Sequence, residues 1–145
     1  ASFVNLNRPE IMSHGIESGS ALAPLLEKAT VIVAGPGMGL GEWAQSCWKK
    51  LLGIKTPMVV DADALSLLAE EPTHQDNWIL TPHPGEAGRL LAVTAADVQN
   101  DRLKSVVTLQ ARYGGVVVLK GSGSLIASST GVVVCGEGNS GMASG

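Results

Sequence analysis

Four short apolar runs, each followed at once by a loop of small or polar residues, constrain the fold of this chain most. The runs are Thr30–Ala34, Pro57–Val60, Asn77–Leu80 and Val116–Leu119. An unbroken apolar run is typical of a strand that is covered on both faces, as in a parallel sheet. Helical patterns separate the four runs, and strands that alternate with helices form right-handed βαβ units. We therefore predict an α/β fold with a mainly parallel sheet.

The segments between the strands are predicted to be helical, because apolar residues recur in them at helical spacing and capping residues mark their ends. In the first helix, Ser20 is the expected N-cap, and Pro24 falls in the first turn, where its missing N–H does least harm. Two more apolar runs flank a polar turn near the end and predict a hairpin. The predicted helices are Ala21–Ala29, Glu42–Leu52, Ala64–Ala69, one that starts at Thr94, and Asp101–Tyr113. The last of these is predicted to bury Leu103, Val106, Val107, Leu109, Gln110 and Ala111. The hairpin strands are Leu125–Ala127 and Val132–Val134.

Composition and charge argue against several classes of protein. The chain has 145 residues, a formal net charge of -3 and no run of Lys or Arg, so a nucleic-acid partner is not expected. No apolar segment approaches the roughly 20 residues that span a bilayer, and no signal peptide is found, so a membrane partner is not expected either. Cys47 and Cys135 lack metal-ligand spacing, which suits reduced thiols in a cytoplasmic protein. Because Ala1 is not Met and Gly145 lies inside a glycine-rich loop, we expect residues 1–145 to be part of one larger domain.

The loops after the first two strands carry glycines and carboxylates. The loop Gly35–Gly41 leads from a strand into a helix, an arrangement in which backbone N–H groups can bind a phosphate or another polar ligand. Its spacing matches neither the dinucleotide fingerprint nor the P-loop. Asp61 and Asp63 follow the second strand and are candidates to hold Mg²⁺ or to orient a hydroxyl group. For Asp63 the alternative is a helix cap, whereas Asp61 has no such alternative and is the candidate metal ligand.

A stiff turn follows the third strand. His83 lies between Pro82 and Pro84, which restrict the backbone on both sides of it. We therefore predict that its imidazole faces a ligand crevice, and the alternative is an ordinary surface or core histidine. Glu86 falls in the first turn of the next helix, where a carboxylate is favourable.

The loop after the fourth strand, Lys120–Ser124 (KGSGS), predicts a phosphate site. Its glycines let backbone N–H groups approach a phosphate, Lys120 supplies a charge, and the serine hydroxyls supply donors. The alternative is a tight turn with an exposed lysine. A second loop of small residues, Asn139–Gly145, also suits an anion. Because ligands bind at the carboxyl ends of parallel strands, we expect these loops to gather at one edge of the sheet.

Five of these motifs, taken in order, resemble a known family. GPGMG, VVDADAL, LTPHPGEAGRLL, VVLKGSGSLIA and GNSGMASG are similar to the ADP- or ATP-dependent NAD(P)H-hydrate dehydratases, close to the half of the bacterial enzymes that is fused to an epimerase. The resemblance covers nearly the whole chain. It implies a ribokinase-like three-layer α/β fold and the restoration of NADH or NADPH from its hydrate. It also implies that the hydrate hydroxyl is phosphorylated and then eliminated, with ADP (or ATP) and Mg²⁺. We further expect a homo-oligomer with an epimerase domain in the same protein.

Carried over by position, the resemblance implies two binding regions. The hydrate substrate would contact the glycine loop and the PHPGE turn, and the nucleotide would contact the two loops rich in serine and glycine. The implied substrate residues are Gly37, Gly39, His83, Pro84, Gly85, Glu86, Ala87, Gly88 and Arg89. The implied nucleotide residues are Lys120, Gly121, Ser122, Gly123, Ser124, Asn139, Ser140, Gly141, Met142, Ala143, Ser144 and Gly145.

The chain departs from the family pattern at its ends. In the family, the last loop continues to an Asp that is the expected catalytic base, and the sequence stops at Gly145 before that position, so no catalytic residue is assigned. Without a general base the rate falls by a factor of about 10²–10⁴, so we expect residues 1–145 alone to be inactive. Two alternatives stay open. One is a ribokinase-fold kinase of a hydroxymethyl-pyrimidine or thiazole, which the GPGMG and PHPGE loops disfavour; the other is a non-catalytic nucleotide sensor.

Overall fold

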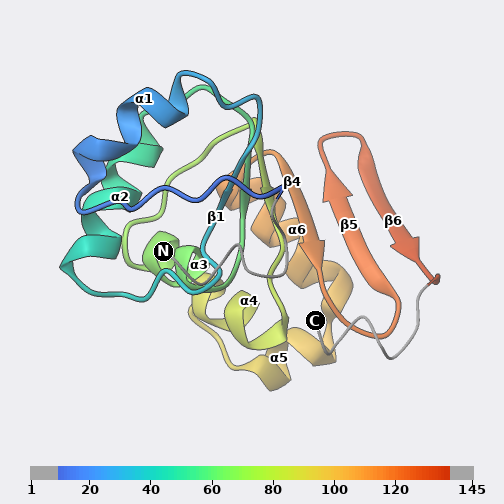
Figure 1. Cartoon of the computed structure of the whole chain (residues 1–145). Helices are drawn as coiled ribbons and strands as arrows, with labels where there is room; N and C mark the ends of the chain where they lie inside the picture. The colour runs from blue at the N-terminus through green and yellow to red at the C-terminus, as the bar shows by residue number, and fades with distance from the viewer. Residues whose placement is uncertain (1–9, 138–145) are drawn as a thin grey trace.

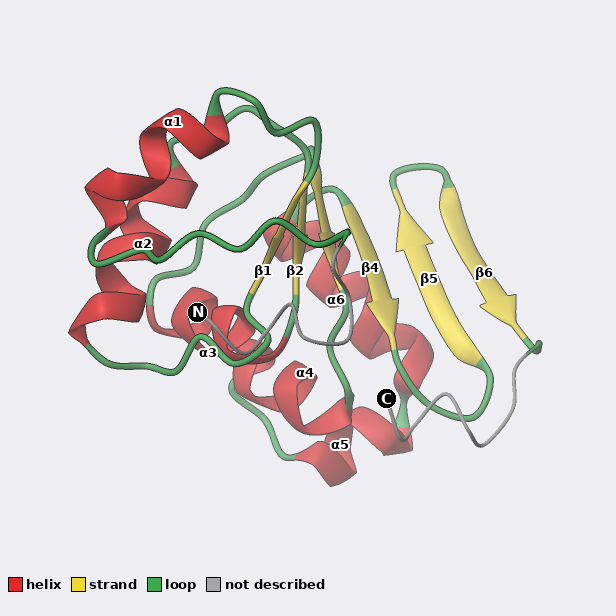
Figure 2. Cartoon of the chain, in the orientation of Figure 1, coloured by secondary structure: helices red, strands yellow, loops and turns green. Residues whose placement is uncertain are grey.

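The computed structural model describes residues 10–137, which form one six-stranded sheet in the order β1-β2-β3-β4-β5-β6 (Figure 1). The first four strands are parallel, and β5 and β6 extend the sheet as an antiparallel hairpin (Figure 2). The predicted parallel sheet and the predicted hairpin are therefore confirmed. The strands are β1 (Ile32–Ala34), β2 (Met58–Val60), β3 (Trp78–Leu80), β4 (Val116–Leu119), β5 (Ser124–Ser128) and β6 (Gly131–Cys135).

Helices connect the successive parallel strands, and capping residues define their ends. Thr94 Oγ1 accepts the N–H of Asp97 at 3.1 Å while Asp97 Oδ2 accepts the N–H of Thr94 at 2.9 Å, which is the predicted capping box. Within residues 10–137, no helix is both long enough and apolar enough to cross a bilayer. The helices are η1 (Gly19–Leu22, a 3₁₀ turn), α1 (Ala23–Leu26), α2 (Glu42–Leu52), α3 (Ala62–Glu70), α4 (Pro84–Leu91), α5 (Ala95–Asn100) and α6 (Arg102–Tyr113).

The first predicted helix was too long. The segment is a 3₁₀ turn followed by a single turn of α-helix, and Ser20 lies inside the 3₁₀ turn, so it does not cap α1. Pro24 does fall in the first turn of α1, as predicted.

The buried side of α6 also differs from the prediction. Leu103 and Val107 are exposed, whereas Ser105 and Tyr113 are buried. Tyr113 lies fully inside because its hydroxyl donates to the carbonyl oxygen of Leu90 on α4 at 2.9 Å. A buried tyrosine needs such a partner, and this one is not visible in the local sequence.

The sheet has one covered face and one open face within the described residues. Side chains of paired residues in neighbouring strands point to the same side, and Val60 and Leu80 are fully buried under the helices. On the other side, Val33, Ile79 and Val133 are 67%, 41% and 62% exposed. The helices of residues 10–137 therefore cover one face, and a third layer is not found among these residues.

The prediction that Thr30–Ala34 is a buried strand was wrong. Only Ala34 is buried in it, and β1 pairs with β2 on one side alone within the described part of the chain. Ile32 and Ala34 face the core, whereas Val33 faces the open side of the sheet. A continuous apolar pattern does not distinguish a central strand from an outer one.

The carboxyl ends of the four parallel strands lie at one edge of the sheet. The strand β1 leads into the glycine loop, β2 into Asp61, β3 into the PHPGE turn and β4 into the KGSGS loop. Backbone hydrogen bonds join these exits: the Asp61 N–H donates to the Ala34 carbonyl at 3.0 Å, and the Lys120 N–H donates to the Pro82 carbonyl at 2.9 Å. The expected gathering of these four motifs at one edge is confirmed.

Candidate functional site

An ion pair lies at the centre of this edge. Lys120 Nζ contacts Asp61 Oδ1 at 2.7 Å and so joins the loop after β4 to the loop after β2. The Lys120 side chain is 42% exposed and that of Asp61 is 29% exposed, so solvent reaches the pair. Asp61 Oδ1 also accepts the N–H of Ala62 at 2.9 Å and thereby caps α3. The expectation that Asp61 has no capping role was therefore wrong, because α3 starts two residues earlier than predicted.

The pKa of Asp61 reflects competing effects. Partial burial raises this pKa, since it disfavours the charged form. The hydrogen bond and the charge of Lys120 lower it, as do the N–H of Ala62 and the hydroxyl of Thr81. The lowering contributions prevail, so the Asp61 pKa lies below its ordinary value and the carboxylate is ionised near neutral pH.

Replacing Asp61 by Asn should make the free energy of unfolding fall less steeply as the pH is lowered below 6. The Asp61 pKa is lower in the folded than in the unfolded protein, so the unfolded state binds more protons at acidic pH. The contribution of Asp61 to stability is then complete above its unfolded pKa and is lost as the pH falls through its folded pKa. Urea unfolding of the full-length protein at a series of pH values from 6 downward, about one unit apart, measures this slope. The exposed substitution Glu27→Gln is the matched control, and equal acid slopes for Asp61→Asn and wild type would contradict the prediction.

Asp63 holds the glycine loop that follows β1. It lies in the first turn of α3, and its Oδ2 accepts the N–H of Gly39 at 2.7 Å. Gly37 and Gly39 have φ values of 70° and 73°, a conformation that favours glycine. The loop from β1 is therefore fixed against α3 by a carboxylate that the sequence analysis assigned to capping or to a metal.

The described residues do not fit a protein-held metal site. Within residues 10–137, no group of three or more His, Cys, Asp and Glu side chains could hold a metal ion. Asp61 pairs with Lys120, and Asp63 accepts from Gly39. A carboxylate that already neutralises an ammonium group is a poor Mg²⁺ ligand, so the candidacy of Asp61 as a metal ligand is not supported.

The KGSGS loop presents unpaired N–H groups at the same edge. Within residues 10–137, the N–H groups of Gly121, Ser122 and Gly123 have no hydrogen-bond acceptor. Gly121 and Gly123 have φ values of 150° and 65°, which let successive N–H groups turn toward one side of the chain. With the Lys120 ammonium beside them, these groups can bind an anion such as a phosphate.

His83 caps the helix that follows it. Its Nδ1 accepts the N–H groups of Gly85 at 2.9 Å and Glu86 at 3.4 Å, and Glu86 Oε2 accepts the N–H of His83 at 2.8 Å. This is a capping box with histidine as the N-cap, and it leaves 57% of the His83 side chain exposed. The flanking prolines and the favourable place of Glu86 are visible in the sequence, whereas the cap by His83 was not predicted.

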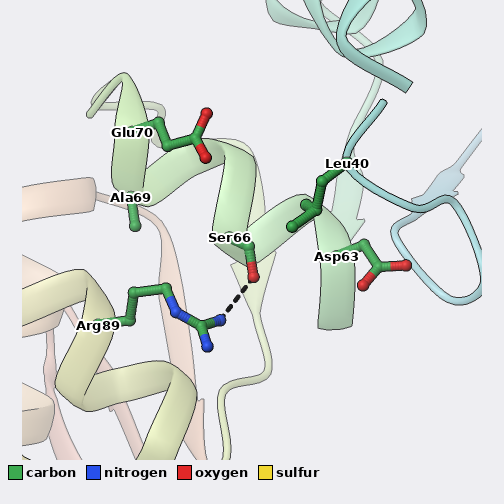
Figure 3. A pocket seen from close by; sticks show the side chains of 6 residues that line it. All are labelled: Leu40, Asp63, Ser66, Ala69, Glu70 and Arg89. Carbon is green, nitrogen blue, oxygen red and sulfur yellow. Dashed lines mark hydrogen bonds between the residues drawn. The ribbon is translucent and has the colours of Figure 1, made fainter. Parts of the chain in front are cut away.

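Arg89 lies in an open pocket between α3 and α4 (Figure 3). Its Nη1 donates to Ser66 Oγ at 2.6 Å, and Ser66 is nearly buried. The other guanidinium N–H groups have no acceptor within the described residues. The pocket has a volume of about 450 Å³, and the glycine loop contributes Leu40 to it. It is lined by Leu40, Asp63, Ser66, Ala69, Glu70 and Arg89.

Some of the predicted substrate residues lie at the pocket and others are buried away from it. Arg89 lines the pocket, and Gly39 adjoins it through Asp63. Ala87 and Gly88 are buried in α4, where packing against the rest of the protein accounts for them. Ser66 was missed, since nothing in the local pattern of α3 marks it. The predicted nucleotide residues from Asn139 to Gly145 lie outside the described residues.

The comparisons with known proteins now identify the family. A family model described as NAD(P)H-hydrate dehydratase matches residues 2–145, which is nearly the whole chain. The chain belongs to this family. The predicted resemblance to NAD(P)H-hydrate dehydratases is thus confirmed.

The sequences of two relatives agree with membership of the dehydratase family. The chain is 51% identical over 139 residues to the bifunctional NAD(P)H-hydrate repair enzyme of Coxiella burnetii, with 95% of the chain and 28% of that protein covered. It is 40% identical over 144 residues to the ADP-dependent (S)-NAD(P)H-hydrate dehydratase of Neisseria meningitidis, with 93% and 47% covered. The chain therefore spans less than half the length of these relatives.

Two solved structures place the chain in the ribokinase-like fold. A ribokinase-like protein of Enterococcus faecalis has a TM-score of 0.83 at 29% identity, with 96% of this chain and 50% of that chain covered. The ADP/ATP-dependent NAD(P)H-hydrate dehydratase of Bacillus subtilis, crystallised with ATP and Mg²⁺, has a TM-score of 0.67 at 31% identity, with 79% and 41% covered. The expected ribokinase-like α/β fold of the dehydratase family is confirmed.

Proposed function

We propose that this chain is part of an ADP-dependent (S)-NAD(P)H-hydrate dehydratase, a lyase that restores NAD(P)H from its hydrate. The observation that carries this proposal is the position of the KGSGS loop. In a chain that the family pattern matches from residue 2 to 145, that loop presents a lysine at the carboxyl edge of the parallel sheet, together with N–H groups that have no acceptor among residues 10–137. Ligands of open α/β sheets bind at this edge.

We propose that Lys120–Ser124 bind the phosphates of ADP, together with Asn139–Gly145. Lys120 provides positive charge, and the N–H groups of Gly121 to Gly123 provide donors. ADP rather than ATP is proposed because the Neisseria relative bears an ADP-dependent name, and ATP is the alternative nucleotide. Mg²⁺ would accompany the phosphates and neutralise part of their charge.

The hydrate substrate is proposed to bind between the glycine loop and the PHPGE turn. Gly37 and Gly39 would offer close backbone approach, and the exposed His83 and Arg89 would line the other side. The guanidinium of Arg89 suits the phosphates of a dinucleotide, because after its bond to Ser66 it keeps donors that no other described residue accepts.

The proposed reaction has two steps. The terminal phosphoryl group of ADP passes to the oxygen of the hydrate hydroxyl, whose proton goes to the general base, and AMP leaves. The C–O bond then breaks to release phosphate, and loss of a proton from the neighbouring ring carbon restores the double bond. Positioning and charge stabilisation dominate phosphoryl transfer, and Lys120 supplies both at the phosphates. The general base is proposed to be an Asp that follows the last loop, beyond Gly145.

We also propose a fused domain, an oligomeric state and a cellular location for the protein. The bacterial relatives are named bifunctional, so we propose that an epimerase domain belongs to the same protein. A cytoplasmic homo-oligomer without nucleic-acid or membrane partners is consistent with the net charge of -3.

An absorbance assay tests the proposed function. The full-length protein is mixed with purified NADH hydrate, ADP and Mg²⁺, and the absorbance of reduced nicotinamide should return. Omitting ADP should abolish the recovery, and residues 1–145 alone should show none. If the full-length protein binds ADP without restoring NADH, the dehydratase is refuted and phosphorylation of a hydroxymethyl-pyrimidine or thiazole is tested next.

A further inference from the structure

Arg102, the first residue of α6, lies beneath the KGSGS loop. Its Nη1 donates to the carbonyl oxygen of Ser122 at 2.8 Å, and its Nη2 donates to the carbonyl oxygen of Leu119 at 3.3 Å. One guanidinium therefore joins the two sides of the turn, from the last residue of β4 to the middle of the loop. The hydrogen bond to Ser122 is short and well within the normal range.

The loop backbone lies close to this guanidinium at Gly121. A Cβ atom at Gly121 would lie 2.9 Å from Arg102 Nη2 and 3.2 Å from its Cζ, so a larger residue would push the guanidinium aside, and the φ of 150° at Gly121 also disfavours one. The Nε of Arg102 is buried and has no acceptor within residues 10–137. Arg102 as a whole is only partly buried, and a buried donor without an acceptor among the described residues is costly.

By its hydrogen bonds, Arg102 occupies carbonyl oxygens of the loop and leaves its N–H groups open to a ligand. It occupies the carbonyl oxygens of Leu119 and Ser122, and Ser124 Oγ donates to the carbonyl oxygen of Gly121 at 3.3 Å. The N–H groups of residues 121–123 have no acceptor within the described part of the chain. A phosphate that approaches the loop therefore meets N–H donors, because the carbonyl oxygens of Leu119 and Ser122, which would repel it, are bound to Arg102.

We infer that Arg102 is a positioning residue for the phosphate loop, which it orients by holding the carbonyl oxygens of Leu119 and Ser122. Arginine suits this role because its planar fork reaches two acceptors at once, which a lysine ammonium on a flexible stem does not match. The inference rests on the proposed nucleotide site, and it extends that site to a residue 18 positions before Lys120 in the sequence.

Substitution of Arg102 by Met or by Lys in the full-length protein tests this inference. The matched control is Arg112→Met, because Arg112 also belongs to α6 and donates to a carbonyl oxygen, that of Leu90 at 3.0 Å, away from the loop. Calorimetry measures the Kd of ADP, the absorbance assay measures KM for ADP and for the hydrate, and thermal unfolding measures stability. We expect both Arg102 variants to raise the Kd and the KM of ADP about 10- to 100-fold, with the KM of the hydrate unchanged within about twofold. Arg112→Met should leave ADP binding unchanged within the same limit.

The outcomes separate this inference from the proposed function. If the wild-type protein binds ADP without dehydrating the hydrate, the dehydratase fails, and the ADP Kd of the variants still decides the role of Arg102. ADP affinity of Arg102→Met equal to that of Arg112→Met would overturn the inference, as would full ADP affinity in Arg102→Lys. A wild-type protein that does not bind ADP at all would overturn both.

Discussion

Replacement of Gly35 by Ala is expected to destabilise the full-length protein by about 4 kcal/mol or more. A Cβ atom at Gly35 would lie 1.6 Å from the carbonyl oxygen of Asp61 and 3.1 Å from the Cβ of Ala64. Its φ of 127° is also one that side chains rarely adopt, which by itself costs roughly 1–3 kcal/mol. The clash is with backbone, so relief requires the exit of β1 to move away from β2. That movement breaks the hydrogen bond from the Asp61 N–H to Ala34 and displaces the site.

Urea unfolding, followed by the fluorescence of the buried Trp48 and Trp78, measures the loss. Two glycines give matched controls, because a Cβ at either would meet nothing within 4 Å. Gly53→Ala, at a φ of -86°, should change stability by less than about 0.5 kcal/mol. Gly37→Ala, at a φ of 70°, isolates backbone strain and should cost about 1–2 kcal/mol. If Gly35→Ala is as stable as Gly37→Ala, the backbone clash is relieved without cost and the prediction is contradicted.

Replacement of Lys120 by Met is expected to weaken ADP binding by about 10- to 150-fold. The substitution removes the only side-chain ammonium in the KGSGS loop and frees the Asp61 carboxylate that it neutralises. A phosphate would then lose a charge-assisted bond and meet a negative charge instead. The pKa of Asp61 should rise toward its ordinary value, since the largest lowering contributions come from Lys120.

Calorimetric titration of ADP at two salt concentrations measures this effect, with Lys49→Met as the control. Lys49 is exposed in the last turn of α2, so its loss should leave the ADP Kd unchanged. Wild-type binding should weaken with salt more steeply than binding by Lys120→Met, because screening acts on the charge that the variant lacks. The double variant Asp61→Asn/Lys120→Met should recover part of the lost affinity. An ADP Kd within twofold of wild type in Lys120→Met would exclude Lys120 from the phosphate site.

The order of the elements and the gathering of the loops were predictable from the sequence. Helices between short apolar runs predict parallel strands, and the carboxyl ends of parallel strands meet at one edge. Thr94 and Asp97 form the predicted capping box, since that signal depends only on local spacing. The family resemblance rested on the same loops, and the match over residues 2–145 confirms it.

The partners of the polar side chains were not predictable. Asp61 was a candidate to hold Mg²⁺ or to orient a hydroxyl group, and the structure pairs it with Lys120, 59 residues away in the sequence. His83 was expected to face a ligand and also serves as a helix cap, because α4 begins directly after it. Arg102 was not singled out at all, since a charged residue at the start of a helix usually faces solvent.

By itself, the sequence determined the α/β class, the positions of most helices and strands, and the loops that meet at the carboxyl edge. These features follow from local periodicity, turn chemistry and the handedness of βαβ units, all of which act over short stretches of chain. Only the tertiary structure decided which face of the sheet is covered, that Lys120 pairs with Asp61, and that Arg102 donates to two carbonyl oxygens at the KGSGS loop. Those outcomes depend on which distant elements come into contact, and a side chain with several suitable partners takes the one that packing brings within reach.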